Sequence, residues 1–251
     1  MINRDELAKF LAQTLNISLI RDYCPNGLQV EGRAEIRTLA SGVTASLALL
    51  EAAVEAKADA VLVHHGFFWR DENPCVIGPK QKRLKLLLQK DISLFAYHLP
   101  LDLHPTLGNN AQLALRLGLQ ADGRFGENDL GWMGTVKQPL LRTVGDLADL
   151  IEKQLNRKPL LIGDANWPLG RIGWCTGAAQ NLLQDAVDAG ATTFLSGEIS
   201  EQTVHLALET GTAYLACGHH ATERYGVQAL GDHIAGQFGI SHRFIDIANP
   251  V

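Results

Sequence analysis

Val61-Leu62-Val63-His64-His65-Gly66 is an apolar run that stops abruptly on two adjacent histidines and a glycine. Three β-prone residues followed by polar side chains and a turn residue predict a buried strand that presents its histidines at its carboxyl end. In open α/β sheets, ligands bind beyond the carboxyl ends of the strands. The stretch therefore predicts an α/β fold with a functional site at this strand end.

The residues around this stretch predict a βαβ unit. Residues 36–43 favour a strand, residues 47–54 an amphipathic helix, and residues 58–65 the strand that carries the histidines. The connection has about the length of a right-handed crossover between parallel strands. Thr44 and Ser46 lie at the junction between strand and helix, where N-capping accounts for both without a functional role.

The next predicted strand, residues 92–97, runs into His98-Leu99-Pro100-Leu101-Asp102. Because proline disfavours a helix through these residues, we expect His98 and Asp102 to lie on a loop beyond the strand.

The same pattern returns from residue 171. Residues 213–217 form another apolar run that ends near His219 and Glu223, and a constant offset between the two halves places His65 on Glu198. The pair His98 and Asp102 likewise matches His219 and Glu223, because the members of each pair are four positions apart. These coincidences predict an internal duplication, with two pseudo-repeated α/β halves that each present ligands at strand carboxyl ends.

Three segments follow from this pattern. Residues 1–125 are predicted to form an N-terminal α/β half, residues 126–170 a small α+β linking segment, and residues 171–251 a C-terminal α/β half. In the middle segment, residues 132–136 favour a strand and residues 144–155 a helix, and no chemistry-bearing motif is evident there.

Composition narrows the class of protein. The net charge of −5 and the pI near 6.0 give no overall positive charge for nucleic acid or anionic membranes, although net charge leaves room for a local positive site. No uncharged run approaches the roughly 20 residues of a membrane span, and the polar amino terminus does not resemble a signal peptide. The four scattered cysteines form no CxxC pair and indicate reduced thiols. We expect a soluble cytoplasmic protein.

The side chains at the strand ends predict a metal site. Imidazole and carboxylate ligands without thiolate suit zinc, manganese, iron or cobalt. Because neighbouring side chains of a strand point in opposite directions, His64 and His65 could bind two different ions, which favours a dinuclear site. Asp102 and Glu223 are the carboxylates that could bridge a metal pair.

Hydrolysis is the natural reaction class for such a site. Two divalent ions bring +4 and two carboxylates −2, so an excess of about +2 remains for a hydroxide and an anionic substrate. His98 or Glu198 could relay protons. We expect His104, His233 and His242 to be structural, whereas the role of His205 stays open.

Several motifs in order carry a family resemblance. They are Pro25-Asn26-Gly27-Leu28-Gln29-Val30, Gly42-Val43-Thr44, Val63-His64-His65-Gly66, His98-Leu99-Pro100-Leu101-Asp102, Gly108-Asn109-Asn110 and Gly218-His219-His220-Ala221-Thr222-Glu223. Together they resemble the NGG1-interacting-factor-3-like family, also labelled GTP cyclohydrolase 1 type 2, over nearly the whole chain.

This resemblance implies an α/β protein with two metal ions per chain, assembled as a toroidal homohexamer, a trimer of dimers, whose metal sites face a central cavity. The family's ligands carry over onto His64, His65, Asp102, His219 and Glu223, and His98 matches a family histidine beside the metals. Many relatives have a long insertion between the halves, and this chain has only the compact segment 126–170.

Two functions are therefore expected. The first is a dinuclear metal-dependent hydrolase that acts on a small anionic substrate such as a nucleotide, with His98 and Glu223 as the catalytic residues. The alternative is a ring-shaped metal-binding scaffold that engages nucleic acid or protein without catalysis. No guanine-reading motif is evident, so the family label alone carries the GTP cyclohydrolase activity.

Overall fold

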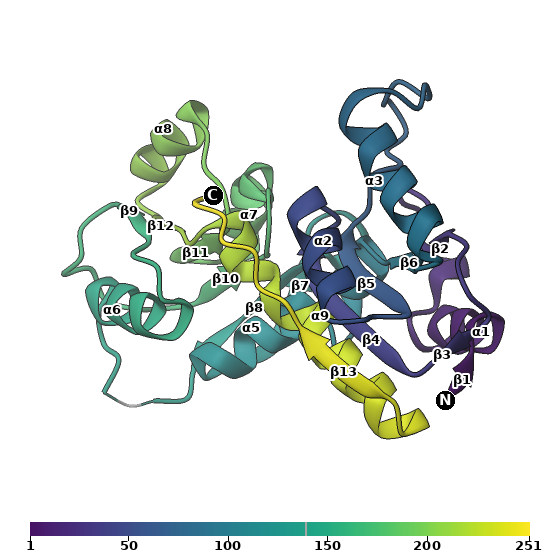
Figure 1. Ribbon diagram of the computed structural model, residues 1–251. Coiled ribbons are helices and arrows are strands. Elements are labelled where there is room, and N and C mark those ends of the chain that lie inside the picture. The colour runs from purple at the N-terminus through teal and green to yellow at the C-terminus, as the bar shows by residue number, and fades with distance from the viewer. Residues whose placement is uncertain (139) are drawn as a thin grey trace. The chain divides into compact units, whose positions relative to one another are not determined.

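The computed structural model describes residues 1–138 and 140–251, which divide into two compact units (Figure 1). The first unit comprises residues 1–108 and 224–248, and the second comprises residues 109–223 and 249–251. The boundary at residue 223 falls within a single helix, α9 (His219–Phe238). The first unit is therefore completed by residues from late in the chain.

The first unit contains a five-stranded sheet with the order β13-β4-β5-β6-β2. The first four of these strands are parallel, and β2 runs antiparallel to β6. Their bounds are Gly27–Val30 for β2, Thr38–Thr44 for β4, Ala60–His65 for β5, Ser93–Ala96 for β6 and Ser241–Phe244 for β13. A separate antiparallel ladder joins β1 (Ile2–Asn3) to β3 (Glu35–Ile36).

Helices cover both faces of this sheet. Its helices are α1 (Arg4–Thr14), α2 (Leu47–Glu55), α3 (Gly78–Lys90), α4 (Leu99–Leu103) and the greater part of α9, with a 3-10 turn at Ile17–Leu19. Leu62 packs with α1 and α9, whereas the adjacent Val61 and Val63 pack with α2 and α3. This alternation is what a strand buried on both faces requires, and it explains why β5 reads as a continuous apolar run.

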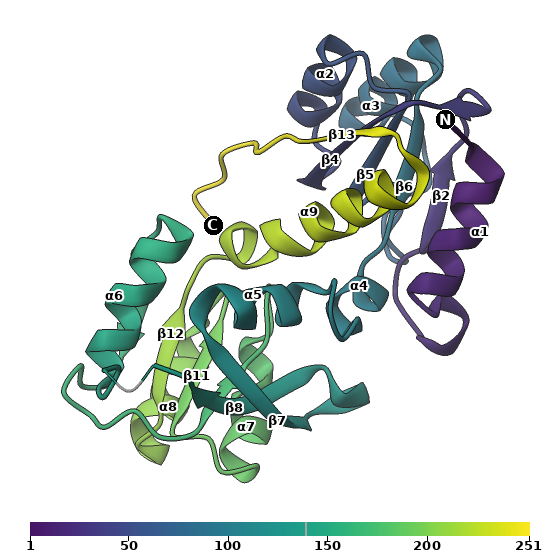
Figure 2. The same cartoon turned by 90° about the horizontal axis from the view of Figure 1, so that it is seen from below.

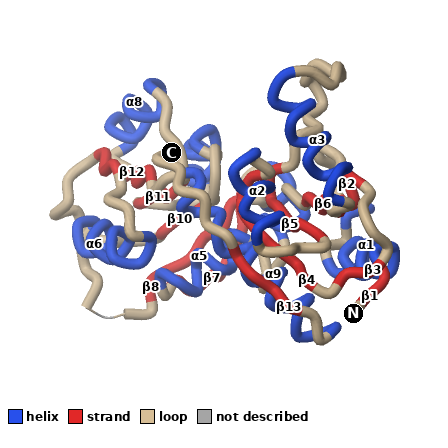
Figure 3. Tube along the Cα trace, viewed as in Figure 1, coloured by secondary structure: helices blue, strands red, loops and turns tan. Residues whose placement is uncertain are grey.

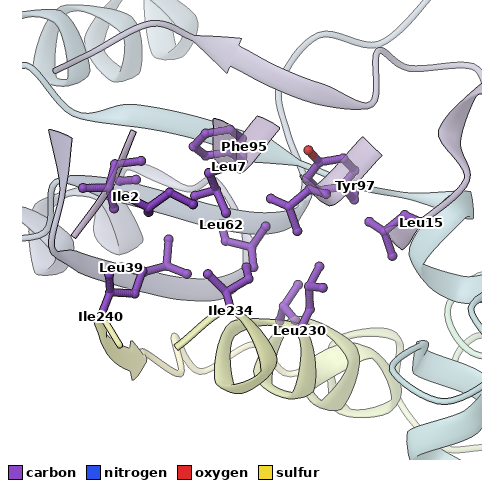
Figure 4. Close-up of a cluster of buried hydrophobic side chains, with 14 of the residues drawn as sticks. Ile2, Leu7, Leu15, Leu39, Leu62, Phe95, Tyr97, Leu230, Ile234 and Ile240 are labelled. Atoms are coloured by element: carbon purple, nitrogen blue, oxygen red, sulfur yellow. The ribbon is translucent and has the colours of Figure 1, made fainter. Parts of the chain in front are cut away.

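Helix α9 is part of the core of the first unit. Figure 2 shows α9 running along one face of the sheet, and Figure 4 shows Leu230 and Ile234 of α9 facing Leu39 and Leu62 of the strands. All four side chains are fully buried. Fully burying one such side chain contributes about 1.5–3 kcal/mol, so the face formed by residues 224–238 is a major part of the stability of this unit.

The second unit contains a six-stranded sheet with the order β7-β8-β10-β11-β12-β9, drawn in red in Figure 3. Its parallel centre consists of β10, β11 and β12, and the outer strands are antiparallel to their neighbours. The bounds are Leu119–Phe125 for β7, Gly131–Val136 for β8, Leu160–Ile162 for β9, Ile172–Trp174 for β10, Thr193–Ser196 for β11 and Ala213–Ala216 for β12.

The helices of the second unit are α5 (Asn109–Leu117), α6 (Val144–Leu155), α7 (Leu183–Asp188), α8 (Glu201–Thr210) and the start of α9, with 3-10 turns at Glu127–Asp129 and Gln180–Leu182. Leu183 of α7 and Ala207 of α8 pack with Phe194 and Tyr214 of the sheet. On α5, the main-chain carbonyl of Asn110 accepts a hydrogen bond from the Trp174 indole at 3.1 Å.

Both sheets contain three parallel strands in sequence order, linked by helices, with an antiparallel strand beside the third. The α/β fold class is therefore confirmed, and the internal duplication stays a prediction. Segment 126–170 supplies β8, α6 and β9, and its two strands lie beside β10 and β12 of the six-stranded sheet. The domain organisation into segments 1–125, 126–170 and 171–251 stays a prediction. The compact units have different bounds. One reason is that β13, near the end of the chain, pairs with β4 of the first unit.

One local prediction is wrong. Leu99–Leu103 forms the helix α4, so Asp102 lies on a helix rather than on a loop. Pro100 lies in the first turn of α4, where amide hydrogens have no partner within the helix and a proline therefore breaks no hydrogen bond. His98 is the residue that immediately precedes this helix.

Among the described residues, no helix combines the length and the apolar composition that a bilayer crossing requires.

Candidate metal centre

His64 and His65 end the central strand β5, and each is held by a neighbouring strand. His64 is fully buried, and its Nδ1 lies 2.9 Å from the main-chain oxygen of Tyr97, directly after β6. On the other side, Nδ1 of His65 lies 3.1 Å from Oγ1 of Thr44, the last residue of β4. Because a carbonyl oxygen only accepts, His64 donates from Nδ1, and its Nε2 presents a lone pair of the kind that binds metals.

The two rings diverge less than simple strand alternation predicts. Their centroids lie 4.6 Å apart, with 45° between the ring planes, although their Nδ1 atoms turn to opposite neighbouring strands. The assignment of His64 and His65 to two different ions stays a prediction.

His98 lies beside these histidines and is fixed by Asp22. Nδ1 of His98 lies 3.1 Å from Oδ1 of Asp22, whose Oδ2 accepts hydrogen bonds at 2.9 Å from the Asn26 amide and from the main-chain N–H of Leu99. The Asn26 side chain also accepts from the main-chain N–H of His98 at 2.7 Å. Burial raises the pKa of Asp22, but the hydrogen bonds from His98, Asn26 and Leu99 outweigh this effect and hold the pKa well below its usual range. Asp22 therefore stays ionised and orients the His98 ring.

Helix α4 adds a carboxylate to this group. Asp102 is buried, and its Oδ2 lies 3.5 Å from Nε2 of His64. One ligand atom from each of His64, His65 and His98 lies within 4.8 Å of the others. Parallel pairing explains the arrangement, because β5 and β6 end at the same edge of the sheet. The first unit thus brings together His64, His65, His98 and Asp102, as the sequence predicts.

The second unit presents a histidine between two carboxylates. Nδ1 of His219 lies 2.7 Å from Oε1 of Glu198, and Nε2 of His219 lies 3.1 Å from Oε2 of Glu223. Glu198 follows β11, whereas His219 and Glu223 lie one turn apart at the start of α9. Burial lowers the pKa of His219, but the carboxylates of Glu223 and Glu198 outweigh this effect and raise the pKa to about 9. The surroundings of this ring therefore favour positive charge.

Two glycines make room for this second group. Gly177 has φ +72°, and a Cβ there would lie 2.2 Å from Oε1 of Glu223. A Cβ on Gly197 would lie within 3 Å of the main chain of His219. Side chains at these positions would displace the two residues, so both glycines are part of the site.

The residues of both groups fit a divalent metal. The second nitrogen of His64, His65 and His219 lies within hydrogen-bond distance of an oxygen, on Tyr97, Thr44 and Glu198 respectively, an arrangement typical of metal-binding histidines. Buried carboxylates lie next to His64 and His219, at positions where a cation is favoured. Nitrogen and oxygen donors without thiolate suit zinc, manganese or iron.

Four other histidines, His104, His205, His233 and His242, belong to neither of the two groups. His104 accepts main-chain hydrogen bonds from the turn that follows it, His233 stacks on Phe10 at 5.8 Å, and His242 hydrogen-bonds Ser and Asp side chains of its own unit. Their structural role stays a prediction that these contacts support. His205 lies on the exposed side of α8 and belongs to none of the potential metal-binding groups among the described residues.

Sequence reasoning missed several residues that position the ligands. Thr44 contacts His65 rather than capping α2, whereas Ser46 does cap α2 as predicted, by accepting from the main-chain N–H of Leu49 at 3.2 Å. Asp22 lies 76 positions from His98, and no spacing signal joins them. The adjacent motif at Asn26 was the only indication that this turn has a role.

Curated relatives match the chain along almost its full length. A protein of Pseudomonas aeruginosa named GTP cyclohydrolase 1 type 2 homolog is 56% identical over 94% of both chains. A protein of Neisseria meningitidis serogroup A with the same name is 51% identical over 100% of both chains.

Solved structures share the fold. The structure described as protein ybgI, of unknown function, is 45% identical, with a TM-score of 0.94 and 100% coverage of both chains. A crystal structure of a Thermus thermophilus protein is 32% identical, with a TM-score of 0.87 and the same coverage. A family model described as Duf34/NIF3 (NGG1p interacting factor 3) matches residues 2–250. The chain therefore belongs to the Duf34/NIF3 family.

Proposed function

We propose that this protein is a dinuclear metal-dependent hydrolase that acts on a small anionic substrate such as a nucleotide. The observation that carries the proposal is the presence, in each unit, of an imidazole beside a buried carboxylate, with the imidazole held by further hydrogen bonds. The relatives' name, GTP cyclohydrolase 1 type 2 homolog, supports the same reaction class and makes GTP the first substrate to test.

The proposed ligands of the two ions are His64, His65, Asp102, His219 and Glu223. Resemblance to the family supports their use as metal ligands, and Asp102 and Glu223 are the carboxylates that could bridge a metal pair. The count of charges supports two ions, because one divalent ion would leave no excess positive charge beside two carboxylates. Zinc, manganese and iron are the metals that the donor atoms suit.

When bound, two such ions would polarise the substrate and lower the pKa of a coordinated water from about 15.7 toward about 7. The chain's own residues would supply orientation and proton transfer. Asp22 accepts from Nδ1 of His98, so Nε2 of His98 is the atom that can take a proton and return it to the leaving group. The ionised Asp22 would stabilise the imidazolium that forms.

The first test of this proposal is metal content together with activity. Metal analysis should find about two ions per chain, and metal-loaded protein should hydrolyse a member of a panel of nucleotides, cyclic amides and phosphoesters. Glu223→Gln should abolish turnover and leave the fold intact, because it removes a ligand charge without changing size. Glu209→Gln, on the exposed side of α8, is the matched control and should behave as the wild type.

A well-folded protein that binds no metal would refute the proposal. If instead the chain binds two ions, hydrolyses none of the panel, and Glu223→Gln changes only assembly or partner binding, the metals are structural and the protein is a scaffold.

We also propose, from the family resemblance, that the protein assembles as a toroidal homohexamer, a trimer of dimers. Light scattering coupled to size-exclusion chromatography should give six times the chain mass of 27.3 kDa. A monomer or dimer at micromolar concentration would contradict this assembly.

A further inference from the structure

A pocket of about 590 Å³ opens beside His98 in the first unit, and we call it the aromatic pocket. Its volume lies in the range of roughly 300–1,000 Å³ that is typical of small-molecule sites. The residues that line it come from the turn before β2 and from the loop between β5 and α3: Asp22, Tyr23, Cys24, Pro25, Phe68, Trp69, Arg70, Glu72, Pro74 and Lys80.

Aromatic rings form the wall of the pocket next to His98. The centroids of Tyr23 and Trp69 lie 5.7 Å apart with 31° between the ring planes. Both rings meet His98 at steep angles, Tyr23 at 5.0 Å and 73° and Trp69 at 5.2 Å and 89°. Tyr23 is nevertheless 49% exposed. The pocket thus offers flat apolar surface directly beside a proposed catalytic histidine.

Arg70 is the charged residue of the pocket that is best placed to bind an anion. Asp22 is engaged by His98, Asn26 and Leu99, and Glu72 pairs with Lys80 at 3.3 Å. Nη2 of Arg70 donates to the main-chain oxygen of Asp22 at 2.8 Å, and among the described residues Arg70 forms no ion pair with a carboxylate. A guanidinium has five donor hydrogens, so Arg70 is held in place while most of its donors stay available for an anion.

We propose that the aromatic pocket binds the planar heterocyclic ring of a nucleotide against Tyr23 and Trp69, with a phosphate at Arg70. Stacking on aromatic side chains accepts any flat base, which agrees with the lack of a base-reading motif. Bidentate hydrogen bonding from a guanidinium to a phosphate then orients the ligand relative to His98. The assignment names the substrate class of the proposed hydrolase, but ring binding itself does not depend on turnover.

The test is calorimetric titration of metal-loaded wild-type protein with GMP, with guanosine and ribose 5-phosphate as partial ligands. GMP should bind more tightly than either. Trp69→Ala should weaken GMP binding about tenfold or more, since base stacking has an effect of this size, and Trp69→Phe should restore most of it. Arg70→Gln should weaken GMP binding and leave guanosine binding unchanged. Arg37→Gln, which changes an exposed arginine paired with Glu35, is the matched control and should bind GMP as its parent does.

GMP binding that is absent, or that is unchanged by both Trp69→Ala and Arg70→Gln, overturns the proposal. The two proposals fail separately. If GMP binds with the expected dependence on Trp69 and Arg70 but the wild type hydrolyses nothing, the pocket assignment stands and the hydrolase proposal falls. If hydrolysis is found and the pocket variants leave its KM unchanged, the substrate binds elsewhere.

Discussion

Gly177→Ala should weaken metal affinity while destabilising the fold about as much as Gly211→Ala does. A Cβ at this position would lie 2.2 Å from Oε1 of Glu223, whereas real Cβ contacts shorter than 3.0 Å are essentially never observed. The carboxylate oxygen must therefore retreat by about 0.8 Å, the difference between the two distances. Ligand distances in metal sites fall within about ±0.2 Å of their standard values, so the shift would weaken metal binding by Glu223.

A second variant, Gly211→Ala, separates the effect of Gly177→Ala on folding from its effect on the metal site. Gly177 has φ +72°, where an alanine costs roughly 1–2 kcal/mol through backbone strain. Gly211 has nearly the same φ, +66°, and no atom lies within 4 Å of a Cβ placed there. Gly211→Ala therefore carries the strain without the clash, because the clashing atom at Gly177 is the end of a flexible side chain that can move aside.

Urea unfolding of metal-free protein should give similar losses of unfolding free energy for the two variants. Metal titration should then show a loss of about 10–100-fold in affinity for Gly177→Ala alone, the range found when the surroundings of a metal ligand are disturbed. Equal metal affinity in the two variants would refute the reasoning, because it would mean that Glu223 does not need the space that Gly177 leaves.

Three further outcomes are expected. Asp22→Asn should lower turnover by about 10–100-fold at unchanged metal content, because His98 loses the carboxylate that orients it; unaltered kinetics would contradict this role. In metal-free protein, His219 has a pKa of about 9 against about 6.5 when unfolded, so the protonated ring stabilises the fold below pH 6.5 and this contribution is lost as pH rises to about 9. Thermal unfolding of wild type should show this decline, and His219→Gln should not. Ser46→Ala should cost about 1 kcal/mol of unfolding free energy, by loss of the cap at Leu49, without changing metal content.

The sequence predicts the central strands well because their burial leaves a strong pattern. Val61 and Val63 face one core and Leu62 the other, so the run before His64 had to be apolar throughout. The ligands at its end were predictable for the same reason, since parallel strands end at one edge of their sheet.

Other features depend on contacts that the sequence does not encode locally. Pro100 in the sequence predicts a break in any helix, yet the first turn of α4 tolerates it. The sequence alone does not show where that helix begins, so it does not decide between a helix and a loop. The carboxylate of Asp22 contacts His98 only because the tertiary fold brings them together. The Thr44 hydroxyl contacts His65 instead of capping helix α2. Such contacts join residues 21 to 76 positions apart without any periodic signal.

The return of residues 224–248 to the first unit has a consequence for how the protein is made. When residues 1–108 have left the ribosome, Leu230 and Ile234 of their core have not yet been synthesised. Strand β13, which pairs with β4, is also still missing. The second unit, by contrast, is almost continuous in the chain and can collapse as soon as residue 223 emerges. During synthesis, the first half to be translated is therefore the last to mature, and a chain interrupted after residue 223 would leave its sheet open to chaperones and proteases.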